Sequence, residues 1–304
     1  MPWRQDGLAR LGVELGRGGS TAFMMLHGGE QVFAWGDIAA RSSVASVRKS
    51  LVSILFGIYT AEGRIDLDAT LADIGVDDIE QLTVDEKRAT IRDLLTTRSG
   101  VYHPSVYDTS RGRPARGSHP PGTHWFYNNW DFNVLGTIFE RITGMGLFEA
   151  FSNRVATPLG MQDFDVSDLR FEHGPESMHP VYKMRLSARD LARVGQLYLQ
   201  GGSWNRHQIV PDVWVRESVR PHVDLGGGRG YGYLWWTAEA GAPGDRLNAD
   251  VPLYYASGFG GQYIIVLPGH DLVVVHRSAR VDHGIDHGRM GEILDVTLEA
   301  MSAA

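Results

Sequence analysis

Ser46 and Lys49 stand three residues apart at the start of an apolar run that covers residues 51–59. In a helix this spacing puts both side chains on one face, with their Cβ atoms about 5–6 Å apart. The run is too apolar for a surface helix, so we expect Lys49 to enter a partly buried site. Burial disfavours the charged ammonium, and a neutral amine can activate a neighbouring serine as a nucleophile. The alternative is an ordinary helix start, with Ser46 at the N-cap and Lys49 extending to water.

Two later segments add polar groups of the kinds that acyl transfer uses. Tyr127 and Asn129 form a Tyr-x-Asn motif before an expected helix, and residues 256–262, Ala-Ser-Gly-Phe-Gly-Gly-Gln, lead into a strand. Ser-x-x-Lys, Tyr-x-Asn and a Ser-Gly strand, in this order, resemble the serine β-lactamase superfamily. The nearest branch contains class C β-lactamases, serine DD-peptidases, family VIII esterases and 6-aminohexanoate-dimer hydrolases. The resemblance covers nearly the whole chain, with framework-like segments at residues 62–68, 94–101, 187–190 and 231–236.

The resemblance implies a role for each matched residue. Ser46 would be the acylated nucleophile, and Lys49 would take its proton or position it. Tyr127 would carry protons to the leaving group and from the deacylating water, and Asn129 would bind a substrate carbonyl and hold Lys49. Whether Lys49 or Tyr127 is the base in the free enzyme stays open, because coupled groups titrate as a unit.

Further residues are expected around the reacting carbonyl. The resemblance implies an oxyanion hole made by the backbone N–H groups of Ser46 and Phe259. Removing one such donor typically raises the barrier by about 3–4 kcal/mol. Ser257 and Gly258 on the same strand are expected to contact substrate. Aromatic side chains could line an apolar acyl pocket or simply pack in the core; they are Tyr102, Trp125, Trp130, Tyr254 and Phe259.

The chain departs from the β-lactamase pattern at two places. Ala256 stands where Lys-Thr-Gly or His-Thr-Gly would supply a cation, and no Ser-Asp-Asn motif is present. We therefore expect poor β-lactam hydrolysis and predict a serine hydrolase of the carboxylesterase or amidase type, acting on small esters or linear amides. The alternatives are a β-lactamase or DD-peptidase, an acyltransferase, or a non-catalytic ligand-binding protein of the same fold.

Composition restricts the other classes of function. The 304 residues carry a net charge of −7 without a basic cluster, so no nucleic-acid partner is expected. The absence of cysteine excludes a thiol nucleophile and disulfides. Neither a membrane-length apolar run nor a signal-like start is apparent, which predicts a cytoplasmic monomer or homodimer without membrane contact. Residues 282–287 include two histidines and two carboxylates, but their glycine-rich setting favours a turn, and we expect neither metal nor cofactor.

Hydrophobic periodicity predicts an α+β protein of the β-lactamase/transpeptidase-like fold. Strands are expected at 21–26, 31–35, 231–236, 262–267 and 272–276, helices at 46–62, 85–97, 130–143, 187–200 and 290–301, and a long loop at 102–124. An antiparallel sheet built from both ends of the chain, residues 1–65 and 205–304, would be flanked by the N- and C-terminal helices. Residues 66–204 would form an inserted, mostly helical lobe, with the active site at the seam.

Overall fold

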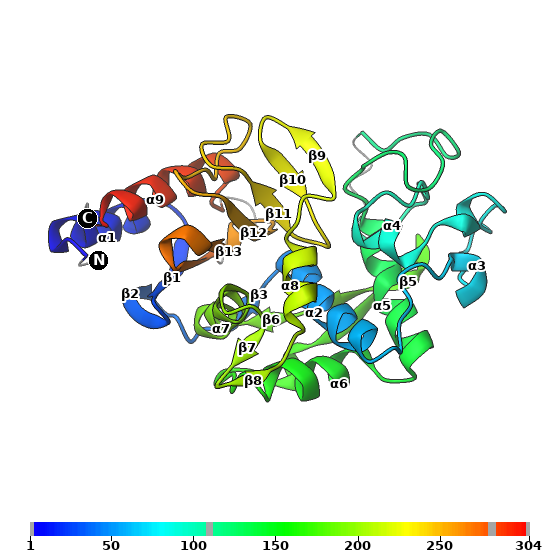
Figure 1. The fold of residues 1–304 in the computed structure, drawn as a ribbon, viewed down its shortest axis with the longest axis horizontal. Coiled ribbons are helices and arrows are strands. Elements are labelled where there is room, and N and C mark those ends of the chain that lie inside the picture. The colour runs from blue at the N-terminus through cyan, green and yellow to red at the C-terminus, as the bar shows by residue number, and fades with distance from the viewer. Residues whose placement is uncertain (1–2, 108–111, 279–283, 302–304) are drawn as a thin grey trace.

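One eight-stranded sheet joins the two ends of the chain. The computed structural model describes residues 3–107, 112–278 and 284–301, and its sheet has the order β2-β1-β14-β13-β12-β11-β10-β9 with every neighbouring pair antiparallel. The N-terminal hairpin therefore pairs directly with the C-terminal one, as Figure 1 shows. The strands are β1 (Ser20–His27), β2 (Glu30–Gly36), β9 (Val223–Gly226), β10 (Arg229–Tyr231), β11 (Trp236–Ala238), β12 (Leu253–Gly258), β13 (Gln262–Leu267) and β14 (Leu272–Ser278).

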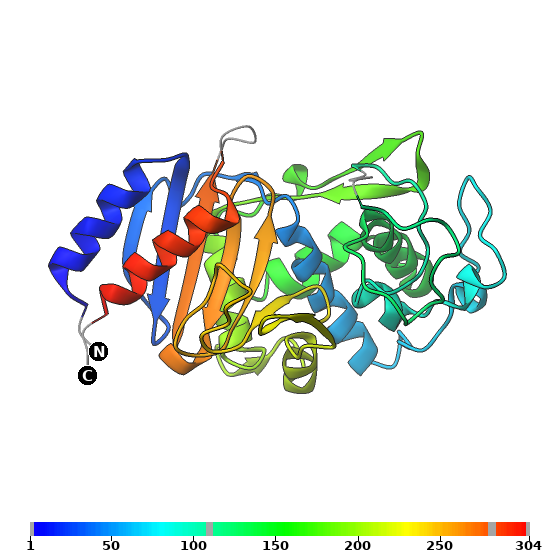
Figure 2. The ribbon, with the colours of Figure 1, turned by 90° about the horizontal axis from the view of Figure 1, so that it is seen from above.

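Different helices cover the two faces of the sheet, and the strand side chains point alternately to one face and to the other. Phe23, Met25 and Val274 belong to a core shared with α1 (Gln5–Gly16) and α9 (His287–Glu299). Their neighbours Met24 and Val275 belong to a larger core that includes α2 (Val47–Ala61) and α7 (Ala188–Leu199). Successive strand side chains point to opposite faces, so apolar residues at consecutive positions fill both layers. Figure 2 shows α1 and α9 side by side on one face.

The helix α2 connects the sheet to the rest of the molecule. Every residue from Val47 to Tyr59 is buried, which explains why this segment lacks a polar face. In Figure 2 the helix runs between the sheet and the lobe that contains α5 (Asn129–Thr143). The remaining elements are β3 (Ser42–Ser43), α3 (Leu71–Ile74), η1 (Glu86–Arg88), α4 (Ile91–Leu95), α6 (Leu147–Phe151), η2 (Ser152–Ala156), η3 (Val166–Asp168), β4 (Arg170–Gly174), β5 (Ser177–Lys183), β6 (Arg185–Leu186), β7 (Ser203–Trp204), β8 (His207–Gln208), α8 (Asp212–Ser218) and η4 (Pro268–His270).

Two expected elements differ from the structure. The helix expected at 85–97 is divided into η1 and α4, because Thr90 starts a new helix by accepting a hydrogen bond from the Asp93 amide. The single strand expected at 231–236 is divided between β10 and β11, with Gly232 and Leu234 in the intervening turn. A Cβ at Gly232 would lie 2.1 Å from the Ser218 carbonyl oxygen, so the turn needs a glycine there.

The helix α7 lies within the stretch that we assigned to the helical lobe, yet its apolar face packs on the sheet. Leu191, Val194 and Leu197 join the core that contains β1, β13 and β14. Among the described residues, no helix is both long and apolar enough to cross a bilayer.

Candidate active site

The backbone around Ser46 is held in a tight turn before α2. Ala45 has a φ of 46°, in the left-handed region that side chains other than glycine rarely adopt. The turn is closed by a hydrogen bond from the Val47 amide to the Val44 carbonyl at 3.1 Å. Upstream, the guanidinium Nη2 of Arg277 donates to the carbonyls of Ser42 and Ser43, both at 2.9 Å. These contacts fix the point at which α2 begins and so the position of Ser46.

Lys49, one turn into α2, is a buried amine with two defined partners. Its side chain is 1 % exposed, and Nζ donates to the Tyr127 hydroxyl at 2.8 Å and to Asn129 Oδ1 at 3.0 Å. The same nitrogen lies 3.7 Å from the centroid of the Phe132 ring. The structure therefore brings the amine of the Ser-x-x-Lys motif together with the phenol and the amide of the Tyr-x-Asn motif.

Burial sets the charge state of this cluster. Desolvation lowers the pKa of Lys49 well below its usual value, and the positive charge of Arg48 lowers it further. Burial also raises the pKa of the Tyr127 phenol, opposed by its contact with the Ser46 hydroxyl and by the charge of Arg48. Both shifts favour a neutral amine beside a neutral phenol. In that state the amine has a lone pair with which to accept a proton.

The start of α5 positions Tyr127 and Asn129. Asn128 caps the helix, with Oδ1 accepting from the Trp130 amide at 3.3 Å and Nδ2 donating to Asp131 at 2.8 Å. One amide proton of Asn129 is donated to the Tyr107 carbonyl at 2.8 Å, which leaves the other for a ligand.

Two rings enclose the Tyr127 ring. Phe132 approaches it at a centroid distance of 4.8 Å, and Trp236 of β11 stacks on it at 5.6 Å with an interplanar angle of 24°. This packing restricts the phenol to one direction, toward Lys49.

The end of β12 packs closely against the segment that leads into α2. A Cβ on Gly258 would lie 3.1 Å from the Ser46 nitrogen and 2.5 Å from the Val44 carbonyl oxygen. Phe259 follows in a turn and is 72 % exposed. Glycine at 258 is thus required by the contact between strand and helix.

The other expected substrate-binding residues lie in different surroundings. Ser257 is half-buried on β12, and Ala256 beside it is fully buried. Trp130 is fully buried, and its indole N–H donates to Asp78 at 2.6 Å in the helical lobe. Tyr102 is 5 % exposed and packs against His119. Trp130 and Tyr102 are therefore buried, which agrees with core packing and not with a place in a substrate pocket.

Sequence reasoning missed three residues that shape the site. Trp236 stacks on Tyr127, the Tyr107 carbonyl receives the Asn129 amide, and Arg277 holds the segment before Ser46. The sequence signal that could have found Arg277 is a charged residue directly after an apolar strand run, since charged residues are rarely buried unless they are paired.

A family model described as Beta-lactamase matches residues 9–289. The chain belongs to the Beta-lactamase family. A 6-aminohexanoate-dimer hydrolase of Paenarthrobacter ureafaciens is 28% identical, covering 91% of this chain and 78% of the relative. Penicillin-binding protein 4 of Amycolatopsis lactamdurans is 26% identical, covering 82% of this chain and 74% of the relative. The crystal structure of a penicillin-binding protein from Bacillus halodurans superposes with a TM-score of 0.71 at 17% identity, covering 97% and 100% of the two chains.

These similarities confirm the family and the α+β, β-lactamase/transpeptidase-like fold expected from the sequence. They also identify the chain as a hydrolase of the serine β-lactamase-related superfamily. Solved structures at this level of identity show the fold alone.

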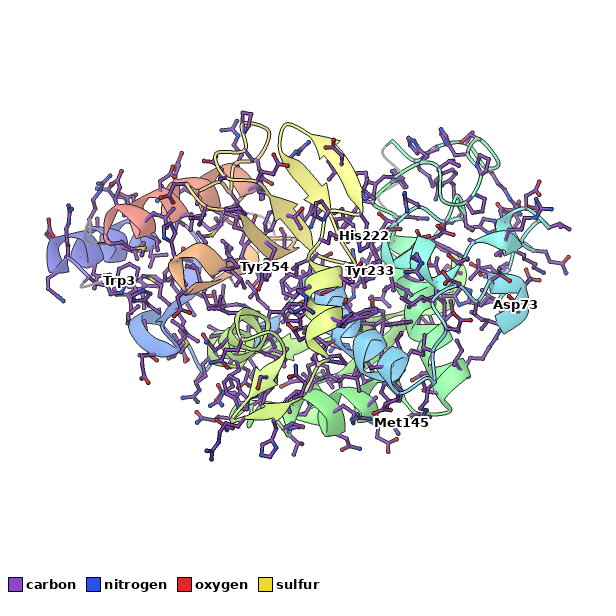
Figure 3. All side chains as sticks on the ribbon, in the orientation of Figure 1. Trp3, Asp73, Met145, His222, Tyr233 and Tyr254 are labelled. Atoms are coloured by element: carbon purple, nitrogen blue, oxygen red, sulfur yellow. The ribbon has the colours of Figure 1, made fainter. Side chains whose placement is uncertain are left out.

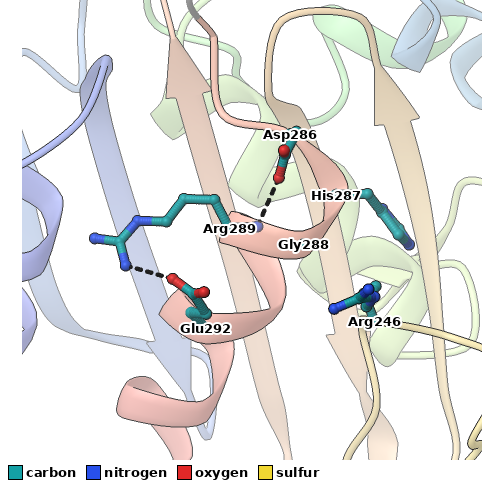
Figure 4. A pocket seen from close by; sticks show the side chains of 6 residues that line it. All are labelled: Arg246, Asp286, His287, Gly288, Arg289 and Glu292. Carbon is teal, nitrogen blue, oxygen red and sulfur yellow. Dashed lines mark hydrogen bonds and ion pairs between the residues drawn. The ribbon is translucent and has the colours of Figure 1, made fainter.

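A pocket of this Beta-lactamase-family protein lies at the start of α9, next to the segment 282–287 for which the sequence favoured a turn over a metal site. Figure 4 shows Asp286 bonded to the Arg289 amide, and Arg289 paired with Glu292. His287 contacts Asp245 at 2.8 Å. Asp282 and His283 lie outside the described residues, and within the described ones no cluster of three or more potential metal ligands occurs.

Proposed function

We propose that the chain is a serine hydrolase that forms an acyl-enzyme on Ser46 and acts on small esters or linear amides. The observation that carries the proposal is the buried Lys49 amine, bonded to Tyr127 and Asn129 one helical turn from Ser46. A neutral amine held there can accept the serine proton during attack. The Tyr127 hydroxyl, bonded to the same amine, then offers a route by which that proton reaches the leaving atom.

Acyl transfer also requires donors for the developing oxyanion, and the close approach of β12 to the start of α2 supports such a site. The amides of Ser46 and Phe259 would donate to the oxygen that becomes negative in the tetrahedral intermediate. Backbone donors held by a strand and a helix start need no reorganisation, and this is what makes such a site effective. The left-handed turn at Ala45, which sets the direction in which α2 begins, supports a role for both the hydroxyl and the amide of Ser46.

The proposed substrate class rests on the lack of a cation at position 256 and on the similarity to a relative with a named substrate. Ala256 is buried and uncharged, so β12 offers no cation of the kind that β-lactam-processing relatives present there. The name of the relative from Paenarthrobacter ureafaciens describes hydrolysis of a linear amide dimer. Both favour esters or linear amides over β-lactams.

The test is hydrolysis of p-nitrophenyl butyrate by the purified protein and two variants. We expect turnover by the wild type and a loss of at least about 10³-fold in Ser46→Ala, because removing the nucleophile removes covalent catalysis. Ser50→Ala is the matched control, since Ser50 is a buried serine of the same helix whose hydroxyl donates to the Leu234 carbonyl at 2.6 Å. Equal turnover in Ser46→Ala and wild type would contradict the proposal.

A further inference from the structure

Two adjacent polar residues, His276 and Arg277, are buried near the end of the apolar strand β14. Each is at most 1 % exposed, and the four strand residues before them, 272–275, are apolar. Val275 belongs to the core that contains α2, as does Tyr254 of β12, which is labelled in Figure 3. Because successive side chains of a strand point to opposite faces, Arg277 faces the layer of α2 and His276 faces the layer of α1 and α9.

His276 holds the turn between β12 and β13. Its Nδ1 contacts the Gly261 carbonyl oxygen at 2.6 Å, and its Nε2 contacts the Ser20 hydroxyl at 2.8 Å. A carbonyl oxygen can only accept, so Nδ1 carries the proton and Nε2 accepts from the serine. Burial lowers the pKa of His276 to about 4, so the ring is neutral and keeps both bonds at neutral pH.

This turn contains Phe259, whose amide is one of the two proposed oxyanion donors. The turn is closed by a hydrogen bond from the Gly261 amide to the Gly258 carbonyl at 3.2 Å. Gly261 is also confined by the segment that precedes α9, since a Cβ at this position would lie 2.8 Å from the Cβ of Ile285. A shift of Gly261 would therefore move the Phe259 amide with it, and the bond from His276 opposes such a shift.

Arg277 holds the segment that leads to the other proposed donor, the amide of Ser46. Its Nη2 donates to the carbonyls of Ser42 and Ser43 at 2.9 Å, while Nε and Nη1 have no hydrogen-bond partner within the part of the chain that the structure describes. Burying a guanidinium with two unpaired nitrogens is unfavourable. The cost points to a role of Arg277 that goes beyond stability.

We propose that His276 and Arg277 are positioning residues, which together set the separation between the amides of Phe259 and Ser46. Their strand is a firm base for this task, because β14 is paired on both sides, with β1 and with β13. Backbone donors stabilise an oxyanion only at hydrogen-bond distance from the oxygen, so small displacements are costly. The inference rests on the proposed function, since it assumes that these two amides bind the oxyanion.

The test compares two esters that differ in one atom. p-Nitrophenyl butyrate has a carbonyl oxygen, and its thiono analogue has sulfur at that position, which is a larger and weaker hydrogen-bond acceptor. The ratio of kcat/KM for the oxygen ester to kcat/KM for the sulfur ester is divided by the same ratio for hydroxide ion in water. We expect a value of at least about 10 for the wild type, because donors spaced for oxygen fit sulfur poorly.

Variants assign this value to the two residues. His276→Leu and Arg277→Met should each lower it about threefold or more, mainly through kcat of the oxygen ester, because the oxyanion forms only during the reaction. His276→Asn keeps an N–H group near the position of Nδ1, and Arg277→Lys keeps a cationic donor. Both conservative variants should retain at least about half of the wild-type value.

His179→Leu is the matched control for His276→Leu. His179 is also a buried histidine, 2 % exposed, and its Nε2 contacts the Asp77 carbonyl at 3.0 Å, but it lies on β5 in the helical lobe. This variant should lower Tm, as His276→Leu does, and should leave the ratio unchanged. The ratio does not depend on the amount of folded enzyme, so a loss of stability alone cannot produce the expected result.

The outcomes separate this inference from the proposed function. If His276→Leu and Arg277→Met hydrolyse both esters with the wild-type ratio, the positioning role is overturned and the Ser46 hydrolase stays intact. A wild-type ratio equal to that of hydroxide ion would overturn it as well, because the amides would then not bind the oxyanion. No hydrolysis of either ester by the wild type would contradict the proposed function itself. The two residues are tested independently, so one folded variant decides.

Discussion

Replacing Lys49 by methionine removes the amine while keeping a long, flexible side chain in the same space. The variant loses the hydrogen bonds to Tyr127 and Asn129, at 2.8 and 3.0 Å. Each partner left unsatisfied costs about 1–3 kcal/mol. Against this, the protein no longer has to bury a group whose charged form is disfavoured. The two effects have opposite signs, so we expect the free energy of unfolding to change by less than about 2 kcal/mol.

The effect on the reaction should be much larger. Without a base, kcat/KM for p-nitrophenyl butyrate should fall by about 10²–10⁴-fold. Lys87→Met is the matched control, because Lys87 forms an ion pair with Asp77 at 2.7 Å near the surface and should lose less than about 1 kcal/mol and no activity. Initial rates and thermal unfolding curves of both variants give the comparison. A Lys49→Met enzyme that keeps more than a tenth of wild-type kcat/KM would refute the assignment of Lys49.

The remaining predictions concern pH, packing and substrate. If the neutral Lys49 amine is the base, kcat/KM should rise with pH through an inflection well below 10.5, since the ammonium form is inactive; a rate independent of pH between 6 and 10 would argue against it. Between that lowered pKa and 10.5 the unfolded chain binds one proton more at this group, so its contribution to stability should increase with pH in denaturant titrations. Gly258→Ala should cost about 1–3 kcal/mol and more than tenfold in kcat/KM, because its Cβ would lie 3.1 Å from the Ser46 nitrogen. Gly16→Ala, with nothing within 4 Å, should cost neither, and equal behaviour of the two variants would contradict the close approach. Nitrocefin turnover should be at least about 10²-fold below ester turnover, and fast turnover would show that Ala256 does not matter as we infer.

The sequence was sufficient to predict those helices and strands whose apolar residues form a clear pattern along the chain. The apolar run after Lys49 predicted a buried helix, and the two short apolar runs at residues 262–267 and 272–276, separated by a turn, predicted the hairpin that β13 and β14 form. The three short motifs identified the family because they follow one another in the order that is typical of that family. The fold and the family followed from these local patterns.

Features that depend on distant contacts could not be predicted. The left-handed Ala45 is stabilised by β3 and by Arg277, which lies more than 200 residues away. The sequence predicted a continuous strand that includes Trp236. The turn that separates Trp236 from β10 depends on the close approach of Gly232 to Ser218, which lies outside the local sequence pattern. Whether an aromatic residue such as Trp130 packs in the core or lines a pocket is decided by its neighbours in space.

The most direct measurement is peptide mass spectrometry of the protein after reaction with a fluorophosphonate. The account predicts one covalent adduct, on the peptide that contains Ser46 and at that residue, with no adduct in Ser46→Ala. Ser50, buried on the same helix with its hydroxyl bonded to a carbonyl, should stay unmodified. An adduct at another residue, or ester hydrolysis that continues in a protein unlabelled at Ser46, would contradict the central claim.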